Sequence, residues 1–424
     1  MLGWEFPPFF TGGLGVATYG MVKALSPKVN IRLIVPNASQ GISFSNVNII
    51  GLNSISAEQL NIESLKFSYV NYTTEVHTLP LTLSSYHHKN EEILRNRLDP
   101  HEEMTAIEKN LSSIRTSFSA DHVYGPDILS KIGLYTQLVG QLASNGGFDI
   151  IHAHDWITFP AGLEVKRSSN KPLLLHIHSL ETDRAGEGVR NEIYHLEKNA
   201  MTAADAIFSV SQFTKDQIIK HYGISPEKIH VVHNGIDPCP KTRVPHKLRD
   251  KLVVFLGRIT HQKGPEFLLE TVEKVTRVFQ RVKFVVAGTG DQFAHLLETS
   301  AYKKLGSKFI FAGFLTKARV EDLLSTADVY FMPSVSEPFG LTALEAVQHH
   351  VPAVLSSQSG AAEVLRASLK ADFWDTDKYA NYIYALLKYD ALNQTLSGNA
   401  HQELNQVTWE QAAEKIINVY QKFK

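Results

Sequence analysis

The chain has 424 residues, 43% of them hydrophobic and 20% charged, which is the composition of an ordinary globular protein of two or three domains. Its 42 basic and 43 acidic residues give a net charge of -1, so the overall charge does not draw the chain to nucleic acid. One cysteine, Cys239, excludes an internal disulfide and a cysteine-rich metal site. Because we find no signal peptide and no apolar run of about 18 residues, we expect a cytoplasmic protein, with peripheral membrane association left open.

A glycine-rich loop follows a short strand that we predict at residues 1–6. Gly12, Gly13 and Gly15 stand between that strand and a helical pattern over residues 16–25. The order strand, loop, helix allows close approach of the backbone to a ligand at a helix N-terminus. The spacing is not the dinucleotide fingerprint G-x-G-x-x-G, and an ordinary tight turn is the alternative interpretation.

Further strands are predicted at residues 30–36 and 47–52, after which the alternation of strands and helices is interrupted. Residues 85–130 are polar and rich in His, Asn, Glu and Arg. We interpret them as an insertion at the edge of the first domain, with a role in acceptor binding or in assembly.

Two buried strands, at residues 148–152 and 173–177, end in pairs of histidines. The four side chains are His152, His154, His176 and His178. Alternation along a strand places the two members of each pair on one face. Four histidines at two strand ends suggest a zinc site, but such a site also needs convergent geometry. We favour a polar ligand at the strand ends, with core histidines in hydrogen bonds as the simpler alternative.

The first domain is expected to end near Asp237. Strands at residues 206–210 and 229–232 precede the turn signal Asn234-Gly235, and a polar stretch at residues 238–249 has the composition of a linker. We therefore assign residues 1–237 to the first domain.

The second domain, residues 238–407, restarts the alternation of strands and helices, which predicts a parallel, doubly wound sheet. Its strands are expected at residues 252–256, 283–287, 308–312, 328–332 and 352–355. The first of them is followed by Arg258 and Lys263 in one loop. Two cations at the carboxyl end of a strand suit a diphosphate, because guanidinium binds it in bidentate fashion and ammonium acts as a point charge.

The segment PSVSEPFGLTALEA at residues 333–346 combines a strand end, a tight loop and a helix N-terminus. Ligands of open α/β sheets bind at such places. The free N–H groups of Leu341 and Thr342 carry the positive end of the helix dipole and suit an anion. Glu337 and Glu345 can face one ligand, although solvated surface carboxylates are the simpler interpretation of either residue alone. A final amphipathic helix is expected at residues 408–424.

Taken together, five motifs resemble those of retaining glycosyltransferases with the GT-B fold. They are, in chain order, G-G-L-G, H-A-H-D-W, V-V-H-N-G-I-D, G-R followed by K-G, and E-P-F-G-L-T-A-L-E. The resemblance is to family 4 (group 1) and to the glycogen and starch synthases. It implies two Rossmann-like, doubly wound domains that face each other across a cleft, and a C-terminal helix that crosses back to the N-terminal domain.

The resemblance also implies roles for residues on the donor side of that cleft. Arg258 and Lys263 bind the diphosphate, Glu337 binds hydroxyls of the transferred sugar, and Glu345 binds the ribose. The backbone N–H groups offered to the donor belong to Gly340, Leu341 and Thr342.

From the N-terminal domain, the resemblance places His178 beside the transferred sugar and Gly12 and Gly13 against the donor. Asp155 and Asn234 are carried over with less support as acceptor-side residues. No metal and no further cofactor are implied.

The predicted activity is that of a retaining hexosyltransferase (EC 2.4), which moves a hexosyl unit, favoured as glucosyl, from a nucleotide-diphosphate sugar to a saccharide or other hydroxyl acceptor. UDP is the favoured nucleotide, with ADP and GDP as alternatives. The other functions considered are α-glucan elongation of the glycogen or starch synthase type, a sugar-nucleotide epimerase on the same fold, and a non-catalytic sugar-nucleotide-binding protein. No nucleic acid partner is expected.

Overall fold

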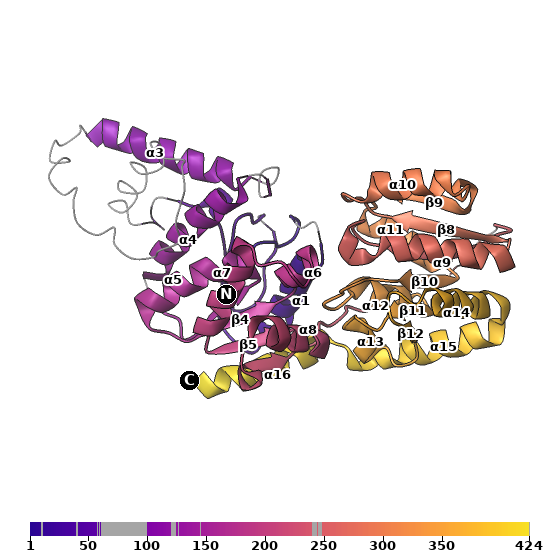
Figure 1. Cartoon of the computed structure of the whole chain (residues 1–424). Helices are drawn as coiled ribbons and strands as arrows, with labels where there is room; N and C mark the ends of the chain where they lie inside the picture. Colours follow the sequence, from indigo (N-terminus) through magenta and orange to yellow (C-terminus); the bar gives the residue numbers. More distant parts are fainter. Residues whose placement is uncertain are drawn as a thin grey trace.

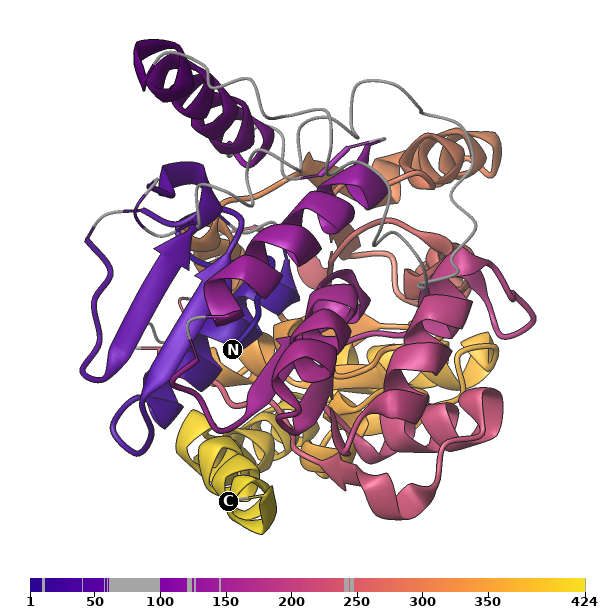
Figure 2. The ribbon, with the colours of Figure 1, turned by 90° about the vertical axis from the view of Figure 1, so that its left-hand side faces the viewer.

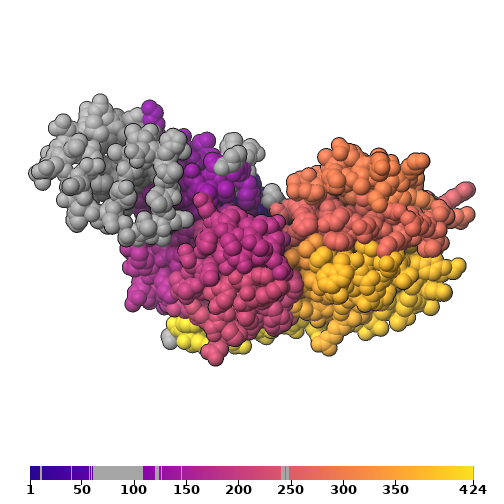
Figure 3. All heavy atoms as spheres, in the orientation of Figure 1, coloured from indigo at the N-terminus to yellow at the C-terminus, as the bar shows by residue number. Residues whose placement is uncertain are grey.

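A computed structural model describes residues 1–9, 12–39, 41–56, 58, 60, 100–119, 124–125, 127–144, 146–239, 244 and 248–423. The chain folds into two lobes joined side by side (Figures 1 and 3). Each lobe has its own parallel sheet with helices on both faces. The predicted fold class, two Rossmann-like domains, is confirmed.

The N-terminal sheet is parallel throughout. Its strands are β1 (Ile31–Val35), β2 (Val47–Gly51), β3 (Ile151–His154), β4 (Leu173–Ile177), β5 (Ala206–Ser209) and β6 (Ile229–Val231). The strand predicted at residues 1–6 is reduced to single bridges from Leu2 to Ile34 and to Ala153. These bridges join the β1–β2 pair to the β3–β4–β5–β6 sheet.

The helices of this domain divide between the two faces of its sheet. In chain order they are α1 (Gly13–Leu25), α3 (Pro100–Ser117), α4 (Ile128–Ser144), α5 (Phe159–Ser169), α6 (Glu181–Ala185), α7 (Glu192–Ala203) and α8 (Gln212–Gln217). Helices α4, α5 and α7 share one apolar core with the sheet, and α1 lies in a second core on the other face. Of the insertion predicted at residues 85–130, residues 85–99, 120–123 and 126 lie outside the described part of the chain.

The C-terminal sheet has the strand order β12-β11-β10-β7-β8-β9. Its strands are β7 (Lys251–Leu256), β8 (Val282–Ala287), β9 (Phe309–Gly313), β10 (Val329–Met332), β11 (Ala353–Ser356) and β12 (Leu369–Ala371). The last strand, β12, was not predicted. It has only three residues, two of them half-buried, which is too short for a recognisable hydrophobic pattern. The chain reverses its direction across the sheet between β7 and β10, which is where an open α/β sheet offers a ligand site.

Helices again cover both faces of this sheet. They are α9 (Pro265–Val278), α10 (Phe293–Tyr302), α11 (Lys317–Thr326), α12 (Leu341–Gln348), α13 (Ala361–Val364), α14 (Thr376–Lys388) and α15 (Asp390–Glu403). Helices α9, α10 and α14 pack on one face, and α11, α12 and α15 on the other.

The last helix, α16 (Trp409–Tyr420), lies on the N-terminal domain (Figure 2). It shares an apolar core with α1, where Trp409 lies so close to Gly20 that a Cβ atom there would meet the indole ring at 2.2 Å. The Tyr420 hydroxyl lies 2.6 Å from Nδ1 of His152. Among the described residues, no helix is both long and apolar enough to cross a membrane.

Candidate active site

The C-terminal side of the candidate site is built from loops at the carboxyl ends of β7 and β8. These loops pack backbone against backbone, since a Cβ atom on Gly288 would lie 1.9 Å from the carbonyl oxygen of Gly257. Only glycine permits this approach, and Gly288 also has a φ of +135°. Arg258 comes directly after Gly257 and is exposed. Lys263 ends the short 3-10 helix η7 (His261–Lys263) and is half-buried.

Glu337 is buried and paired with Lys263. Its Oε2 accepts hydrogen bonds from the ammonium group of Lys263 and, at 3.2 Å, from the hydroxyl of Ser334. The loop that carries it is fixed from behind, because the N–H of Glu337 bonds the carbonyl of Gln358 at 2.9 Å. Glu337 is therefore a buried carboxylate with charged and polar partners and not a solvated loop residue.

Helix α12 begins directly after this loop, with Gly340 as its N-cap at a φ of +99°. Its N-terminus faces the other domain, because a Cβ atom on Gly13 would lie 3.8 Å from Cδ1 of Leu341. Thr342 is held by a 2.7 Å bond between its hydroxyl and that of Tyr330. The positive end of the α12 dipole and the glycine-rich start of α1 therefore face each other across the domain boundary.

Glu345 lies one turn inside α12. Burial raises its pKa to about 7, an effect that the positive charge of Lys317 partly opposes and the negative charge of Glu321 reinforces. A half-buried carboxylate whose ionisation is unfavourable gains most when a ligand donates hydrogen bonds to it.

From the N-terminal domain, His178 lies at the end of β4. Its Nε2 is 3.0 Å from Nδ1 of His154, and burial lowers its pKa to about 3, so the imidazole is neutral. Asp155 holds the turn in which His178 stands, because its Oδ1 accepts the N–H groups of His178 at 2.7 Å and Ser179 at 3.2 Å.

Asp155 itself has a strained backbone. Its φ of 61° and ψ of 163° lie in a region that residues other than glycine rarely adopt. Burial raises its pKa to about 7, although the nearby Arg184 and the two N–H groups oppose the shift. Strain and a perturbed carboxyl at the same residue, beside His178, are typical of a functional site.

Family models account for both halves of this arrangement. Residues 95–239 match the model described as Glycosyltransferase Family 4, and residues 241–403 match that of Glycosyl transferases group 1. The chain belongs to the group 1 glycosyltransferases and has their GT-B fold.

Individual relatives of this glycosyltransferase carry different names. A D-inositol 3-phosphate glycosyltransferase of Catenulispora acidiphila is 28% identical over 311 residues, which cover 66% of this chain and 74% of that protein. The sucrose-phosphate synthase of Thermosynechococcus elongatus superposes with a TM-score of 0.68 at 18% identity, over 99% of this chain and 95% of that one. An Anabaena protein, HepE, in complex with UDP, superposes with a TM-score of 0.65 at 15% identity, over 99% of each chain.

Two residues of the glycosyltransferase that sequence reasoning did not select lie near the same domain boundary. Glu5 is buried, and its carboxylate accepts the N–H of Gly15 at 3.1 Å and the hydroxyl of Tyr124 at 2.6 Å. Burial and Glu5 raise the pKa of Tyr124, while the positive charge of Arg258, from the other domain, acts in the opposite direction. The position of Glu5, just before the glycine-rich loop, was the one available signal for it.

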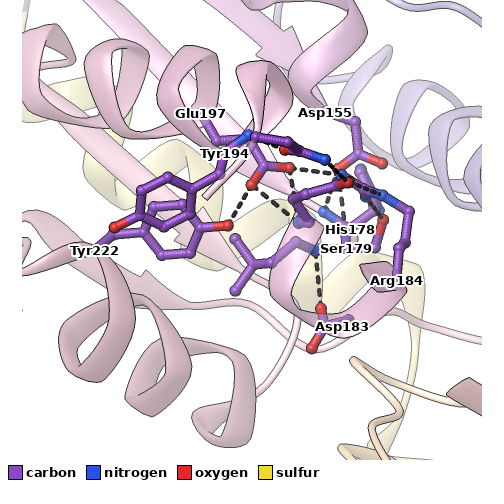
Figure 4. Close-up of polar contacts among 11 residues, drawn as sticks. Asp155, His178, Ser179, Asp183, Arg184, Tyr194, Glu197 and Tyr222 are labelled. Atoms are coloured by element: carbon purple, nitrogen blue, oxygen red, sulfur yellow. Dashed lines mark hydrogen bonds and ion pairs between the residues drawn. The ribbon is translucent and has the colours of Figure 1, made fainter. Parts of the chain in front are cut away.

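Sequence reasoning also missed a buried ion network behind His178 (Figure 4). Glu197 of α7 accepts the N–H of Glu181, a 2.7 Å bond from Arg184 and the hydroxyl of Tyr222. Arg184 also donates to Glu181 at 2.9 Å and to the hydroxyl of Ser179 at 2.6 Å. The network fixes α6 to α7 and so holds the segment that follows His178.

The four histidines lie together, but their rings are stacked. His152, His154 and His176 offer ring nitrogens within 4.8 Å of one another, and their ring planes differ by only 9° to 24°. A tetrahedral zinc site needs in-plane lone pairs that aim at one point, and near-parallel stacked rings do not provide them. Burial lowers the pKa of all three well below its usual value, so they form a neutral layer beneath His178.

Asn234 lies apart from these groups, in the connection between the domains. It is buried, and its neighbour Gly235 lies against the backbone of Thr408 and Trp409, where a Cβ atom would be 2.1 Å from the nitrogen of Trp409. The structure therefore places Asn234 where the C-terminal segment crosses back to the first domain.

Proposed function

We propose that this glycosyltransferase moves a hexosyl unit, favoured as glucosyl, from a nucleotide-diphosphate sugar to a saccharide or other hydroxyl acceptor, with retention of configuration. The observation that carries the proposal is the Lys263–Glu337 pair at the N-terminus of α12. It puts a cation for phosphate, a carboxylate for sugar hydroxyls and free helix N–H groups in one loop cluster.

The donor would lie along the carboxyl edge of the C-terminal sheet. Arg258, Lys263 and the α12 N–H groups of Leu341 and Thr342 would bind the diphosphate. Glu345, half-buried and four residues further along α12, would accept the ribose hydroxyls. UDP is the favoured nucleotide, which agrees with the UDP bound to the structurally similar HepE.

In the reaction, the bond between the anomeric carbon and the β-phosphate oxygen breaks, and its electron pair leaves with the phosphate. The acceptor hydroxyl forms the new bond on the same face, and its proton passes to the departing phosphate oxygen. Arg258 and Lys263 stabilise the charge that develops there, and one such contact is commonly worth about 3 kcal/mol in the transition state. Neutral His178 and the carboxylate of Glu337 would orient the sugar.

The first test is a thermal-shift panel of UDP, ADP and GDP with their glucose conjugates. A ligand that binds only the folded state raises the midpoint with the logarithm of its concentration over its Kd. We expect one nucleotide to raise the midpoint and the shift to vanish in Lys263→Ala. Absence of a shift with every nucleotide, in protein that is otherwise folded, would contradict the proposed donor site.

A further inference from the structure

We propose that Asp183 and Ser336 form a positioning pair that locks the His178 segment of one domain to the Glu337 loop of the other. The hydroxyl of Ser336 donates a 2.5 Å hydrogen bond to Oδ1 of Asp183 across the domain boundary. Ser336 directly precedes Glu337, and Asp183 stands five residues after His178. The bond therefore joins the two groups that would contact the transferred sugar from opposite sides.

Asp183 uses its second oxygen within its own domain. Oδ2 accepts the N–H of Leu180 at 2.8 Å, which caps the start of α6 two residues after His178. One carboxylate thus ties the end of β4 to the C-terminal domain. The residue is only 6% exposed, so solvent competes little for the cross-domain bond and the bond keeps much of its strength.

The N-terminal end of this connection is rigid. Helix α6 has only five residues, but Arg184 and Glu181 fasten it to the buried carboxylate of Glu197 on α7. In Figure 4, Asp183 lies on the side of α6 away from Glu197. A displacement of Ser336 is therefore transmitted to the His178 segment and is not absorbed by a mobile helix.

At its C-terminal end, the connection reaches the donor-binding cation. The N–H groups of Val335 and Ser336 both point at the carbonyl of Gln262, at 2.9 Å and 3.5 Å, and Gln262 precedes Lys263. The carboxylate of Glu337 pairs with Lys263 itself. The Asp183–Ser336 bond thus fixes His178 relative to both Glu337 and Lys263.

The functional consequence rests on the proposed glycosyl transfer. Reacting groups must be held near their productive positions, and a displacement of about 1 Å commonly costs on the order of a hundredfold in rate. Closure of the two domains over the donor also excludes water and limits its hydrolysis. Loss of the pair should therefore reduce the rate of transfer more than it weakens donor binding.

The deciding experiment needs no substrate. Amide hydrogen exchange would be measured on the full chain for wild type, Ser336→Ala, Asp183→Asn and Ser336→Thr. We expect Ser336→Ala to speed exchange about tenfold in residues 178–185 of the opposite domain, as loss of one hydrogen bond to a charged group predicts. Ser336→Thr, which keeps the hydroxyl, should restore most of the protection.

The matched control for Asp183→Asn is Asp390→Asn. Asp390 is an exposed carboxylate 4.0 Å from Lys251, at the opposite end of the C-terminal sheet from Ser336.

Faster exchange confined to residues around 336, with exchange in residues 178–185 unchanged, would contradict the proposed positioning pair.

The second measurement uses the nucleotide that the thermal-shift panel identifies and its glucose conjugate. Ser336→Ala should bind this nucleotide within about twofold of wild type, and with a saccharide acceptor present should transfer glucose to it about tenfold more slowly. If wild type binds no nucleotide but the exchange result holds, the pair stands and the proposed function fails. If nucleotide affinity falls as much as turnover, the positioning role fails instead.

Discussion

The two walls of the cleft hold their charges in opposite ways. On the C-terminal wall, Lys263 pairs with Glu337, with 18% and 9% of the side chains exposed, and Arg258 is exposed beside them. On the N-terminal wall, Arg184 has 22% of its side chain exposed, but it is engaged with Glu181, which is 7% exposed, and with Glu197, which is 1% exposed and has both carboxylate oxygens bonded. One wall keeps its charges within reach of a ligand, and the other uses them within the protein.

This difference assigns a task to each wall. Both hydrogen bonds from Lys263 and Ser334 go to one oxygen of Glu337, so the Lys263–Glu337 pair can open to take a phosphate and a sugar hydroxyl. A buried pair with every oxygen engaged cannot exchange partners cheaply, and it fixes geometry instead. We therefore expect substitutions on the N-terminal wall to reduce stability and those on the C-terminal wall to reduce binding.

The largest effect is expected from Glu197→Ala. Its removal leaves the guanidinium of Arg184 and the N–H of Glu181 without their buried partner. Breaking a buried ion pair from one side costs about 3–5 kcal/mol. Urea unfolding followed by tryptophan fluorescence would measure the loss.

The control for this prediction is Glu164→Ala, which breaks an exposed pair with Arg167. An exposed helix pair is worth only about 0.3–0.5 kcal/mol. Equal losses in the two variants would mean that the N-terminal network does not stabilise the fold, and the contrast between the walls would be lost.

The second prediction compares the two cations of the donor wall. Lys263→Ala leaves the buried carboxylate of Glu337 without its charged partner and should cost about 1–3 kcal/mol of unfolding free energy. Arg258→Ala removes an exposed side chain and should stay within about 0.5 kcal/mol of wild type.

Both variants should nevertheless bind the donor nucleotide on the order of a hundredfold more weakly, because on the proposed donor geometry each removes a phosphate contact. Titration calorimetry with the nucleotide would measure this. If Arg258→Ala binds as tightly as wild type, Arg258 does not contact the diphosphate.

The third prediction concerns the pH dependence caused by Glu345. Its pKa is raised from 4.5 to about 7 in the folded protein, so the folded state holds a proton that the unfolded state has lost between these values. Stability therefore falls as pH rises from about 4.5 to 7, and the cost stays constant above 7. Glu345→Gln should be more stable than wild type by about 2–3 kcal/mol at pH 8, with no difference near pH 4.

Denaturant midpoints of both proteins between pH 4 and pH 8 would measure this difference. Donor binding should change in the opposite sense, because hydroxyl groups of the ligand stabilise the ionised carboxylate. Wild type should bind more tightly as pH rises through 7, while the glutamine variant should bind weakly throughout. A pH-independent stability difference would show that Glu345 ionises normally.

Much of the fold follows from local sequence. Short runs of apolar residues gave all but one strand of the C-terminal sheet, because a strand buried between helix layers is apolar throughout. The same signal failed at residues 1–6, where Leu2 alone bridges β1 and β3. The pattern predicts burial there, but hydrogen-bond pairing depends on neighbours that local sequence does not specify.

The site was less accessible to sequence reasoning. Lys263 and Glu337 could be selected because each stands in a loop with a glycine nearby at a strand end. Glu197, Arg184 and Asp183 could not, because they lie on helices whose spacing is also that of ordinary surface residues. Their burial arises only when α6 packs against α7 and against the second domain, which is a tertiary property.

The smallest effect is expected at a second contact between the domains, made by Glu363 of α13. Its carboxylate accepts the N–H groups of Gln212 and Phe213 at 2.9 Å and 2.7 Å, at the N-terminus of α8, and lies 2.8 Å from Nε2 of His233. The side chain is 24% exposed, so water can replace part of the hydrogen bonding that a substitution removes.

We expect Glu363→Gln to reduce the free energy of unfolding by about 0.5–1 kcal/mol, the usual contribution of a carboxylate at a helix N-terminus. Urea unfolding beside Glu414→Gln, whose side chain is 64% exposed and pairs with Lys28 at 3.2 Å, would show whether the difference exceeds that of an exposed pair. A loss as large as that of Glu197→Ala would mean that this contact stabilises the fold as the buried network does, and that depth of burial does not separate the two kinds of charge.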